Sequence, residues 1–341
     1  MSPRPIRAHP LEAVDVLAAP VVDLAGIPFR LAASDLPRAA AVASLFRQAE
    51  VSTLLPRCSL SFVESGPVTP TLSPVVTVAG VDVWRPAQDE VVLRSPEGLT
   101  ARSSANEIVV GGAADALARV FRNVCVVALT HLFAAHDRHL FHAGAFVIDD
   151  RAVLVLGNTG SGKSTLTYAA VRLGWPVLAD DLVALCRQDG VVRARGMPRP
   201  ISVPRDMLAD GPSGGRPVPE DPRRRTELPV GTLAGTTHQV AGIVVTERGP
   251  GPSSTVESLA GLDALRHVLQ ASTSLADRDL LPDVLAIAAQ VARGPRWLLR
   301  HGTDPSAGLD DATAGLQAIE RDLLERRADP PSGVRPDGPG S

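Results

Sequence analysis

The segment that begins at residue 157 has the residue types and spacing of a phosphate-binding loop. It reads Gly-Asn-Thr-Gly-Ser-Gly-Lys-Ser and fits the pattern G-x-x-x-x-G-K-[ST] without a mismatch. Glycines let the backbone curl until successive N–H groups point at phosphate oxygens, and the N-terminus of a following helix adds further donors. The residues expected to bind a nucleoside triphosphate are Gly157, Asn158, Thr159, Gly160, Ser161, Gly162, Lys163, Ser164 and Thr165.

Lys163 is the only lysine among the 34 Lys and Arg residues of the chain. A compact ammonium on a thin stem can reach the β- and γ-phosphates, where a bulky guanidinium fits poorly. The neighbouring Ser164 hydroxyl would bind Mg²⁺. A glycine-rich turn that keeps one lysine by chance is the alternative. It accounts neither for the apolar run 152–156 before the loop nor for the helical pattern after it.

Two adjacent acids, Asp180 and Asp181, follow an apolar run 17 residues beyond Lys163. Ligands of open α/β sheets bind beyond the carboxyl ends of strands, so these carboxylates are expected near the γ-phosphate. A Mg·ATP site needs an acidic group for the metal, and a kinase needs a carboxylate near the acceptor hydroxyl. Neighbouring strand residues point to opposite faces, so at least one acid must lie past the strand end. A solvated turn or helix cap is the alternative.

Four of the eight histidines lie close together in the sequence, and one of them precedes the loop by a single hairpin. Their irregular spacing does not predict a zinc site. His142 starts the segment His-Ala-Gly on the first strand of that hairpin, from which it could reach the phosphates. A strand histidine with ordinary hydrogen bonds fits the same position. The four are His131, His136, His139 and His142.

The order of these features resembles the HPr kinase/phosphorylase family and its HprK-related kinases. It also resembles the wider P-loop class shared with phosphoenolpyruvate carboxykinase. The resemblance rests on His-Ala-Gly at 142–144, the loop at 157–164 and Ala-Asp-Asp at 179–181. It is clearest over 139–200, continues weakly to about residue 325, and does not cover 1–110. It implies an α/β P-loop kinase domain that uses ATP and Mg²⁺ to phosphorylate a serine hydroxyl of a peptide or small protein.

The resemblance also implies roles for single residues. Lys163 and Ser164 would bind phosphate and Mg²⁺, and Asp181 would be the general base that takes the serine proton. Asp180 would act on the metal or phosphate side, and His142 would lie near the transferred phosphate. Similar kinases in lasso-peptide clusters phosphorylate the precursor peptide, which is a plausible setting here.

Two features depart from the family pattern. Members with phosphorylase activity carry Glu directly after the P-loop Ser, where this chain has Thr165. Their segment with Arg and Pro near the C-terminus has no convincing counterpart. The resemblance therefore implies neither the reverse reaction nor regulation through HPr itself. Arg199 follows the strand after the acid pair and could line the site, although a surface arginine in a turn is equally compatible.

Composition excludes several other classes. A net charge of −3 and a pI of about 6.2 indicate no general affinity for nucleic acid. Three distant cysteines are typical of a reducing compartment. No apolar run approaches the ~18 residues of a membrane span. We therefore expect a cytoplasmic protein that binds neither membranes nor nucleic acid. Family members often oligomerise, so a homo-oligomer is possible, but nothing in the sequence specifies an interface.

Hydrophobic periodicity places the motifs on expected elements. A three- to four-residue period over 113–135 predicts a long buried helix. Two apolar runs, 140–148 and 152–156, predict a β-hairpin that leads into the loop. A helix over 163–173 should follow and end at Gly174. Residues 21–31 should form two strands around a turn at Gly26 and Pro28, and a short helix over 39–48 should be opened by Asp35 and Pro37. Other strands are expected over 75–84, 90–94, 107–110, 176–179, 182–186, 191–194, 240–246 and 296–300, and other helices over 262–270, 280–293 and 310–326.

We predict three regions in the chain. Residues 1–112 form a strand-rich N-terminal region with an antiparallel meander. Residues 113–326 form the P-loop kinase domain, in which the Gly-, Pro- and Arg-rich segment 209–227 is a mobile loop. Residues 327–341 are a disordered tail.

Two other functions remain open. In a small-metabolite kinase the acid after the P-loop helix binds a substrate hydroxyl, but such enzymes start with the P-loop strand, whereas here the loop begins at residue 157. A non-catalytic module that binds a nucleotide and recognises a peptide through its N-terminal part is the other alternative.

Overall fold

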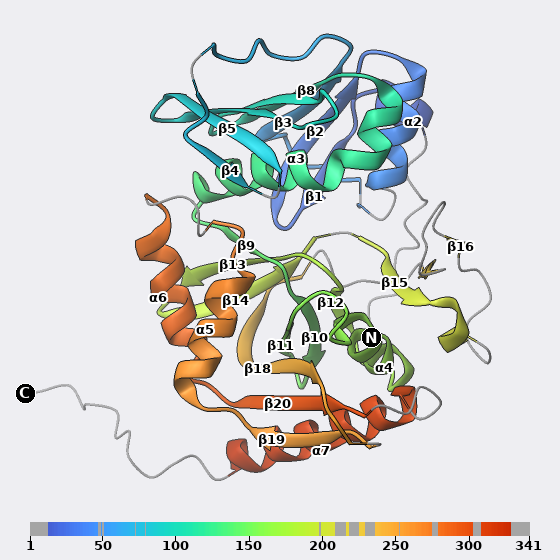
Figure 1. Cartoon of the computed structure of the whole chain (residues 1–341), viewed down its shortest axis with the longest axis vertical. Coiled ribbons are helices and arrows are strands. Elements are labelled where there is room, and N and C mark those ends of the chain that lie inside the picture. Colours follow the sequence, from blue (N-terminus) through green and yellow to red (C-terminus); the bar gives the residue numbers. More distant parts are fainter. Residues whose placement is uncertain are drawn as a thin grey trace, which may run out of the picture.

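In the computed structural model the chain forms a mixed α/β structure, with a sheet of N-terminal strands above a larger second unit (Figure 1). None of the described helices is long and apolar enough to cross a membrane. The structure describes residues 13–46, 49, 51–71, 73–78, 80–197, 199–208, 216–217, 225–228, 236–251, 253–274, 279–302 and 308–328.

The N-terminal sheet has eight strands within the described ranges, in the order β1-β2-β3-β8-β7-β6-β5-β4. Strands β4 to β8 pair antiparallel with their sequence neighbours, which confirms the expected meander. By contrast, β2, β3 and β8 pair in parallel, because longer connections carry the chain back between them. The strands are β1 (Val21–Leu24), β2 (Ile27–Ala33), β3 (Cys58–Val63), β4 (Val76–Val78), β5 (Val81–Ala87), β6 (Glu90–Arg94), β7 (Thr100–Ser103) and β8 (Glu107–Gly111).

Three details of this sheet differ from the prediction. Strand β3 was not predicted. The single strand expected over 75–84 is a hairpin, because the chain turns at Gly80, whose φ is +79°. Strand β7 was not predicted. It is short, and its burial alternates as in a half-buried strand, but Arg102 and Ser103 break the apolar signal.

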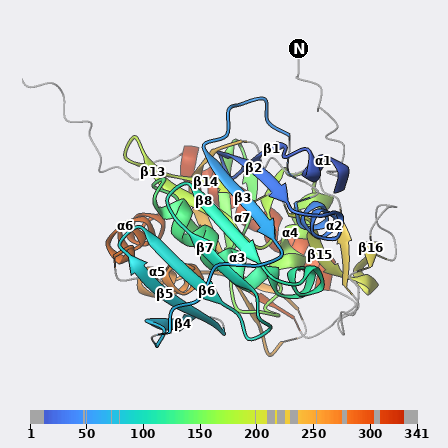
Figure 2. The same cartoon turned by 90° about the horizontal axis from the view of Figure 1, so that it is seen from above.

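Three helices cover one face of the N-terminal sheet: α1 (Ala13–Leu17), α2 (Leu36–Leu45) and α3 (Ala114–Ala134). The α2 helix begins at Leu36, three residues before the expected range 39–48, because Asp35 caps it by accepting a hydrogen bond from the backbone N–H of Arg38 at 3.0 Å. The long buried helix predicted over 113–135 is confirmed as α3, in which Leu117, Val124 and Leu132 are fully buried. Figure 2 shows α3 running beneath the strands of this sheet.

The long helix α3 packs against the N-terminal sheet rather than standing apart from it. It shares one hydrophobic core with strands β6, β7 and β8, and this core extends to Leu182, Ala184 and Met197 of the second unit. The boundary at 112/113 stays a prediction, but the two regions on either side of it have a continuous core.

The second sheet is built around the strand that leads into the P-loop. Its order among the described strands is β12-β10-β11-β18-β14-β13-β9, and β20 pairs with both β18 and β19. Strands β11, β18 and β20 are mutually parallel. The strands are β9 (His139–Phe141), β10 (Gly144–Ile148), β11 (Arg151–Leu156), β12 (Val177–Ala179), β13 (Val183–Gln188), β14 (Val191–Gly196), β18 (His238–Arg248), β19 (Thr255–Ser258) and β20 (Arg296–His301).

The expected first strand of the hairpin, 140–148, is interrupted at His142. Strand β9 pairs with β13, whereas β10 pairs with β11 and β12, so the two halves join different neighbours. The hairpin between β10 and β11 is present as predicted, with Asp149 and Asp150 at positive φ in its turn. The interruption is possible because the His142 N–H donates to the Ala271 carbonyl at 2.6 Å.

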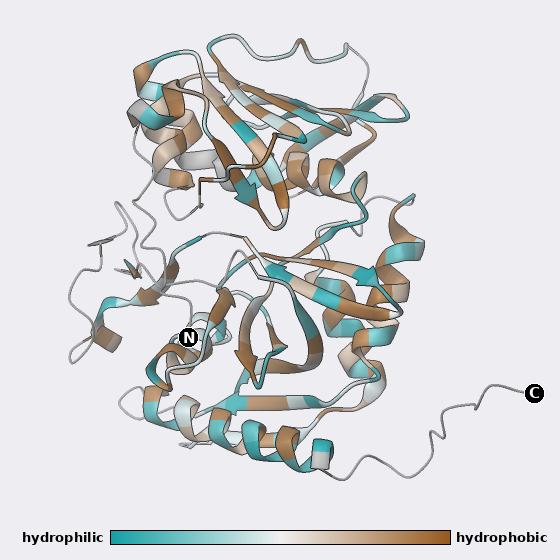
Figure 3. Cartoon of the chain, turned by 180° about the vertical axis from the view of Figure 1, so that it is seen from behind, coloured by the Kyte–Doolittle hydropathy of each residue, from teal (hydrophilic) through white to brown (hydrophobic). Residues whose placement is uncertain are grey.

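Helices cover both faces of the second sheet. Alternating side chains of β11 and β18 point to opposite faces, as the strand period requires. Leu154 and Ile243 pack against α5 (Gly261–Ala271) and α6 (Leu281–Val291). Val153 and Val244 pack against α4 (Lys163–Arg172) and α7 (Gly308–Ala328). Figure 3 shows the resulting alternation of hydrophobic and hydrophilic bands along α7. The expected helices 163–173, 262–270, 280–293 and 310–326 are confirmed.

A small third sheet lies beside α4. It joins β15 (Ile201–Pro204), β17 (Arg225–Leu228) and β16 (Arg216–Pro217), and a 3-10 helix at Arg205–Leu208 follows β15. The segment 209–227, predicted to be a mobile loop, therefore contributes two short strand pieces, and its other residues lie outside the described residues. Of the predicted tail, residues 327 and 328 belong to α7, and the remainder also lies outside the described residues.

Candidate active site

The segment 157–164 curls between the end of β11 and the start of α4. Gly157, Gly160 and Gly162 have φ angles of +147°, +83° and +108°, which other residues rarely adopt. A side chain would also collide with its surroundings at two of them. A Cβ on Gly157 would lie 2.5 Å from Ser161 Oγ, and one on Gly162 would lie 2.2 Å from His301 Nε2. The glycines of the motif are thus required by the backbone.

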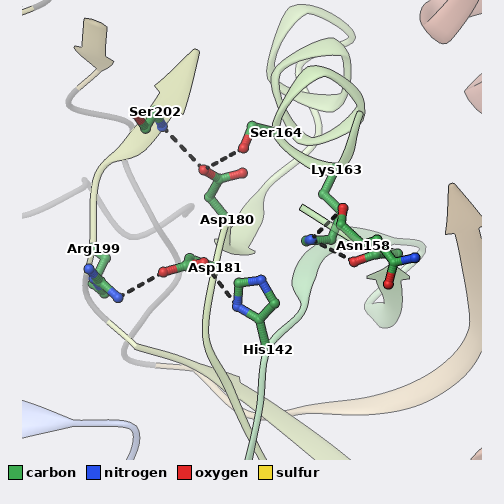
Figure 4. A network of polar contacts seen from close by, with 9 residues as sticks. His142, Asn158, Lys163, Ser164, Asp180, Asp181, Arg199 and Ser202 are labelled. Carbon is green, nitrogen blue, oxygen red and sulfur yellow. Dashed lines mark hydrogen bonds and ion pairs between the residues drawn. The ribbon is translucent and has the colours of Figure 1, made fainter. Parts of the chain in front are cut away.

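Lys163 is the first residue of α4 and is held by the loop itself. Its Nζ donates to the carbonyl of Gly157 at 2.7 Å and to that of Asn158 at 3.3 Å. Its side chain is buried, so the ammonium lies inside the loop rather than in solvent. Figure 4 shows the side chain turned back along the loop toward Asn158. A phosphate in the loop would offer this ammonium a charged acceptor in place of neutral carbonyls.

The other loop residues divide into exposed and anchored ones. Asn158, Thr159 and Gly160 are exposed. Ser161 is buried, and its hydroxyl lies 2.7 Å from the hydroxyl of Thr246 on β18. The Thr165 hydroxyl is directed away from the loop toward Met207 Sδ, at 3.7 Å. The position after the P-loop Ser therefore faces the 3-10 helix that follows β15.

Asp180 lies just past the end of β12, buried beside the start of α4. Its Oδ2 accepts a hydrogen bond from Ser164 Oγ at 3.1 Å and one from the backbone N–H of Ser202 at 3.2 Å. Gly144 on β10 permits close packing of this strand against α4, because a Cβ there would lie 2.8 Å from the Thr167 hydroxyl. Asp180 is therefore in direct contact with the Ser of the P-loop.

Asp181 faces the opposite way from Asp180 and is about one-third exposed. Its Oδ1 lies 3.1 Å from His142 Nδ1, and its Oδ2 accepts from Arg199 Nη1 at 2.8 Å. Both acids lie beyond the strand end, as the argument from strand geometry required. Figure 4 shows His142 and Arg199 approaching Asp181 from two sides.

The residues around α4 suit a hard divalent cation. Ser164 Oγ and Asp180 Oδ2 are oxygen donors only 3.1 Å apart, at the start of the P-loop helix. Mg²⁺ is commonly held by one or two such protein oxygens together with water and substrate phosphates. Within the described residues no group of three or more His, Cys, Asp or Glu side chains could hold a metal ion.

Three other residues contact the P-loop from the C-terminal half of the chain, and sequence reasoning missed them. Thr246 links the loop to the sheet by donating to the Leu156 carbonyl at 3.2 Å. Arg248 Nε donates to the Gly160 carbonyl at 3.3 Å, and His301 packs against Gly162. No local motif marks these positions, because each is placed only by the pairing of β18 with β11 and of β20 with β18.

The other three histidines of the sequence cluster, His131, His136 and His139, are not part of this site. His136 Nε2 lies 3.2 Å from the buried Cys58 thiol and 2.9 Å from the Ala105 carbonyl. His131 Nδ1 lies 3.4 Å from Ser103 Oγ. Burial lowers the pKa of His139, and burial also raises the pKa of Cys58 to about 11. Cys58 and His139 are buried, and His131 and His136 are half-buried. The expectation that these histidines form no zinc site stays a prediction.

Comparisons with known proteins do not identify a family for this chain. No protein-family model matches the chain, and no curated protein matches it. Among solved structures, the HPr(Ser) kinase/phosphatase from Coxiella burnetii matches over 55% of this chain and 98% of its own length, with 16% identity and a TM-score of 0.29. At this identity and TM-score, function has to be inferred from the side chains of this chain.

Proposed function

We propose that this protein is a Mg·ATP-dependent kinase that transfers the γ-phosphate to a serine hydroxyl of a peptide or small protein. The observation that carries the proposal is the meeting of the P-loop and the acid pair at one sheet edge. Ser164 at the loop and Asp180 beyond β12 are in direct contact, at 3.1 Å. The proposal places the protein in the cytoplasm, with the acceptor and further copies of this chain as its partners and with neither nucleic acid nor membrane.

The two acids suit different tasks. Asp180 is buried against Ser164 and would hold Mg²⁺ together with that hydroxyl. When bound, Mg²⁺ would neutralise charge on the β- and γ-phosphate oxygens. Asp181 is partly exposed, so an acceptor hydroxyl can reach it. It is therefore the better candidate for the base that takes the serine proton.

His142 and Arg199 would position this base. They bind different oxygens of Asp181 and so fix the plane of its carboxylate. His142 itself is fixed by its backbone bond to Ala271 at the interruption between β9 and β10. Phosphoryl transfer depends mainly on positioning and charge neutralisation, so a fixed carboxylate beside a P-loop is what the reaction needs.

The proposal is tested by phosphorylation of a peptide library. Libraries centred on Ser, Thr or Tyr are incubated with the full chain, ATP and Mg²⁺, and a phosphate mass gain is measured. We expect gain in the Ser-centred library, and Asp181→Asn should reduce it by about a hundredfold, as expected for loss of a general base.

Asp189→Asn is the matched control, because Asp189 is exposed in the turn between β13 and β14, and asparagine tolerates its positive φ of 51°. Equal activity of the Asp181 and Asp189 variants would refute the assigned base. ATP binding without transfer to any library would favour the non-catalytic module, and transfer only to small alcohols would favour the metabolite kinase.

A further inference from the structure

The edge of the second sheet arranges four strand ends in a row. Strand β12 is antiparallel to β10, which is antiparallel to β11, so β12 and β11 run in the same direction. Strands β18 and β20 run parallel to β11 on its other side. The order along this edge is therefore the acid pair, the P-loop, the end of β18 and the end of β20.

This order determines how a triphosphate can lie in the loop if the proposed function holds. The γ-phosphate has to face Asp180 and Asp181, where the metal and the acceptor would bind. The α-phosphate and the nucleoside then extend away from the acid pair. That direction leads across the loop to the ends of β18 and β20, on the side of Arg248 and His301.

Arg248 offers an unpaired positive charge on that side. It is the last residue of β18 and is exposed, and its Nε donates to the Gly160 carbonyl at the rim of the loop. Within the described parts of the chain, no carboxylate lies within ion-pair distance of its guanidinium. The neighbouring Arg300 differs, because it forms an ion pair with Glu257 at 2.7 Å.

His301 adds no charge there. Its ring is buried against Gly162, and its Nε2 has no hydrogen-bond partner among the described residues. Burial, helped by the nearby charge of Arg248, lowers the pKa of His301 to about 4, so the ring is neutral at physiological pH. Arg248 is thus the cation that this side of the loop presents to an anion.

We propose that Arg248 binds the α-phosphate and sugar side of a nucleoside 5′-triphosphate, across the P-loop from Asp180. Its bond to Gly160 uses only Nε, so the two Nη groups can donate to a phosphate oxygen as a fork. The loop and Lys163 already bind the two outer phosphates, so Arg248 is left for the α-phosphate and the sugar. A nucleotide offers both of these groups, whereas inorganic polyphosphate has no sugar. This assignment rests on the proposed function and adds the nucleoside side of the same site.

The test compares two ligands in one set of variants. Dissociation constants of Mg·ATP and of Mg·pyrophosphate are measured by calorimetry for the wild type, Arg248→Ala and Arg300→Ala. We expect Arg248→Ala to weaken ATP about tenfold, the size expected for hydrogen bonds to a charged group. Pyrophosphate binding should change by less than about twofold, since it needs only the loop and Lys163. Arg300→Ala should leave both ligands unchanged, and Arg248→Lys should fall between alanine and wild type.

The outcomes separate this inference from the proposed function. Unchanged ATP binding in Arg248→Ala would overturn the inference while the kinase proposal stands. An equal loss for ATP and pyrophosphate would also overturn it, because Arg248 would then act on the shape of the loop through Gly160. ATP binding that Lys163→Ala leaves intact would overturn the proposed nucleotide site and the inference together.

Discussion

At the scale of single residues, the chemistry concentrates on side chains whose contacts are specific to their type. Lys163 is enclosed by two loop carbonyls, at 2.7 and 3.3 Å from its Nζ. Asp180 and Asp181 are adjacent in sequence but bind different partners, the first Ser164 and the second His142 and Arg199. Sequence spacing predicted the lysine and both acids. The family resemblance implied a different task for each acid. Spacing alone could not divide the tasks, because the burial and the partners of the two carboxylates come from the tertiary structure.

Lys163→Arg tests whether the single lysine is required for its shape as well as its charge. The guanidinium is too large for the space between the carbonyls of Gly157 and Asn158, so it cannot reach the β- and γ-phosphates in the same way. We expect the rate of peptide phosphorylation to fall at least about a hundredfold, as when a preorganised donor to developing charge is lost. Arg172→Lys, at the exposed end of α4, is the control. A Lys163→Arg rate close to that of the control would contradict the role given to the lysine.

At the scale of elements, the site depends on strands that are distant in sequence. Strand β11 and helix α4 were expected from periodicity and form as predicted. Strands β18 and β20 were also expected. The pairing of β18 with β11, and of β20 with β18, places Thr246, Arg248 and His301 against the loop, and pairing order is not readable from local pattern. The interruption at His142 was missed for the same reason, since it arises from pairing with two different neighbours.

His301 provides a pH test of the contact between β20 and the loop. Its folded pKa of about 4 is below the ordinary value of 6.5, so the unfolded chain binds more protons between these values. The contribution of His301 to the free energy of unfolding should be fully present above pH 6.5 and should be lost as the pH decreases toward 4. The loss should be about 3 kcal/mol if the whole pKa shift is realised.

Urea unfolding of wild type and His301→Leu across this pH range measures the contribution. The leucine variant should have a flatter dependence, because it removes the titrating group. If the free energy of unfolding depends on pH in the same way in both proteins, the His301 ring is not held buried and neutral against Gly162.

At the scale of the whole molecule, the N-terminal sheet and the second unit share a core and polar contacts. Arg195 on β14 pairs with Asp23 of β1 at 3.0 Å, and both side chains are less than one-fifth exposed. Strand β14 leads directly to Arg199 at the site. The N-terminal region is thus joined to the strand that precedes a positioning residue, although the resemblance found in the sequence did not extend to residues 1–110.

Asp23→Asn tests this junction. The amide oxygen can still accept the hydrogen bond that Asp23 accepts from the Gly26 N–H at 2.7 Å, so the change removes mainly the ion pair. We expect a loss of about 1–3 kcal/mol in the free energy of unfolding, because a mostly buried arginine loses its charged partner. Arg266→Ala breaks an exposed pair and should cost less than about 1 kcal/mol. Equal losses in the two variants would mean that the ion pair between Asp23 and Arg195 contributes no more to the free energy of unfolding than an exposed ion pair does.

The sequence by itself determined the P-loop, its helix, the acid pair beyond a strand end and the mixed α/β class. These follow from local rules: glycine spacing, apolar period and the position of polar residues after apolar runs. Only the tertiary structure decided that Asp180 contacts Ser164, that Arg199 and His142 share Asp181, and that Arg248 lies across the loop. One arginine among many carries no signal in the sequence. The role of Arg248 depends on which strand ends lie beside it, and the long-range pairing of strands determines these neighbours.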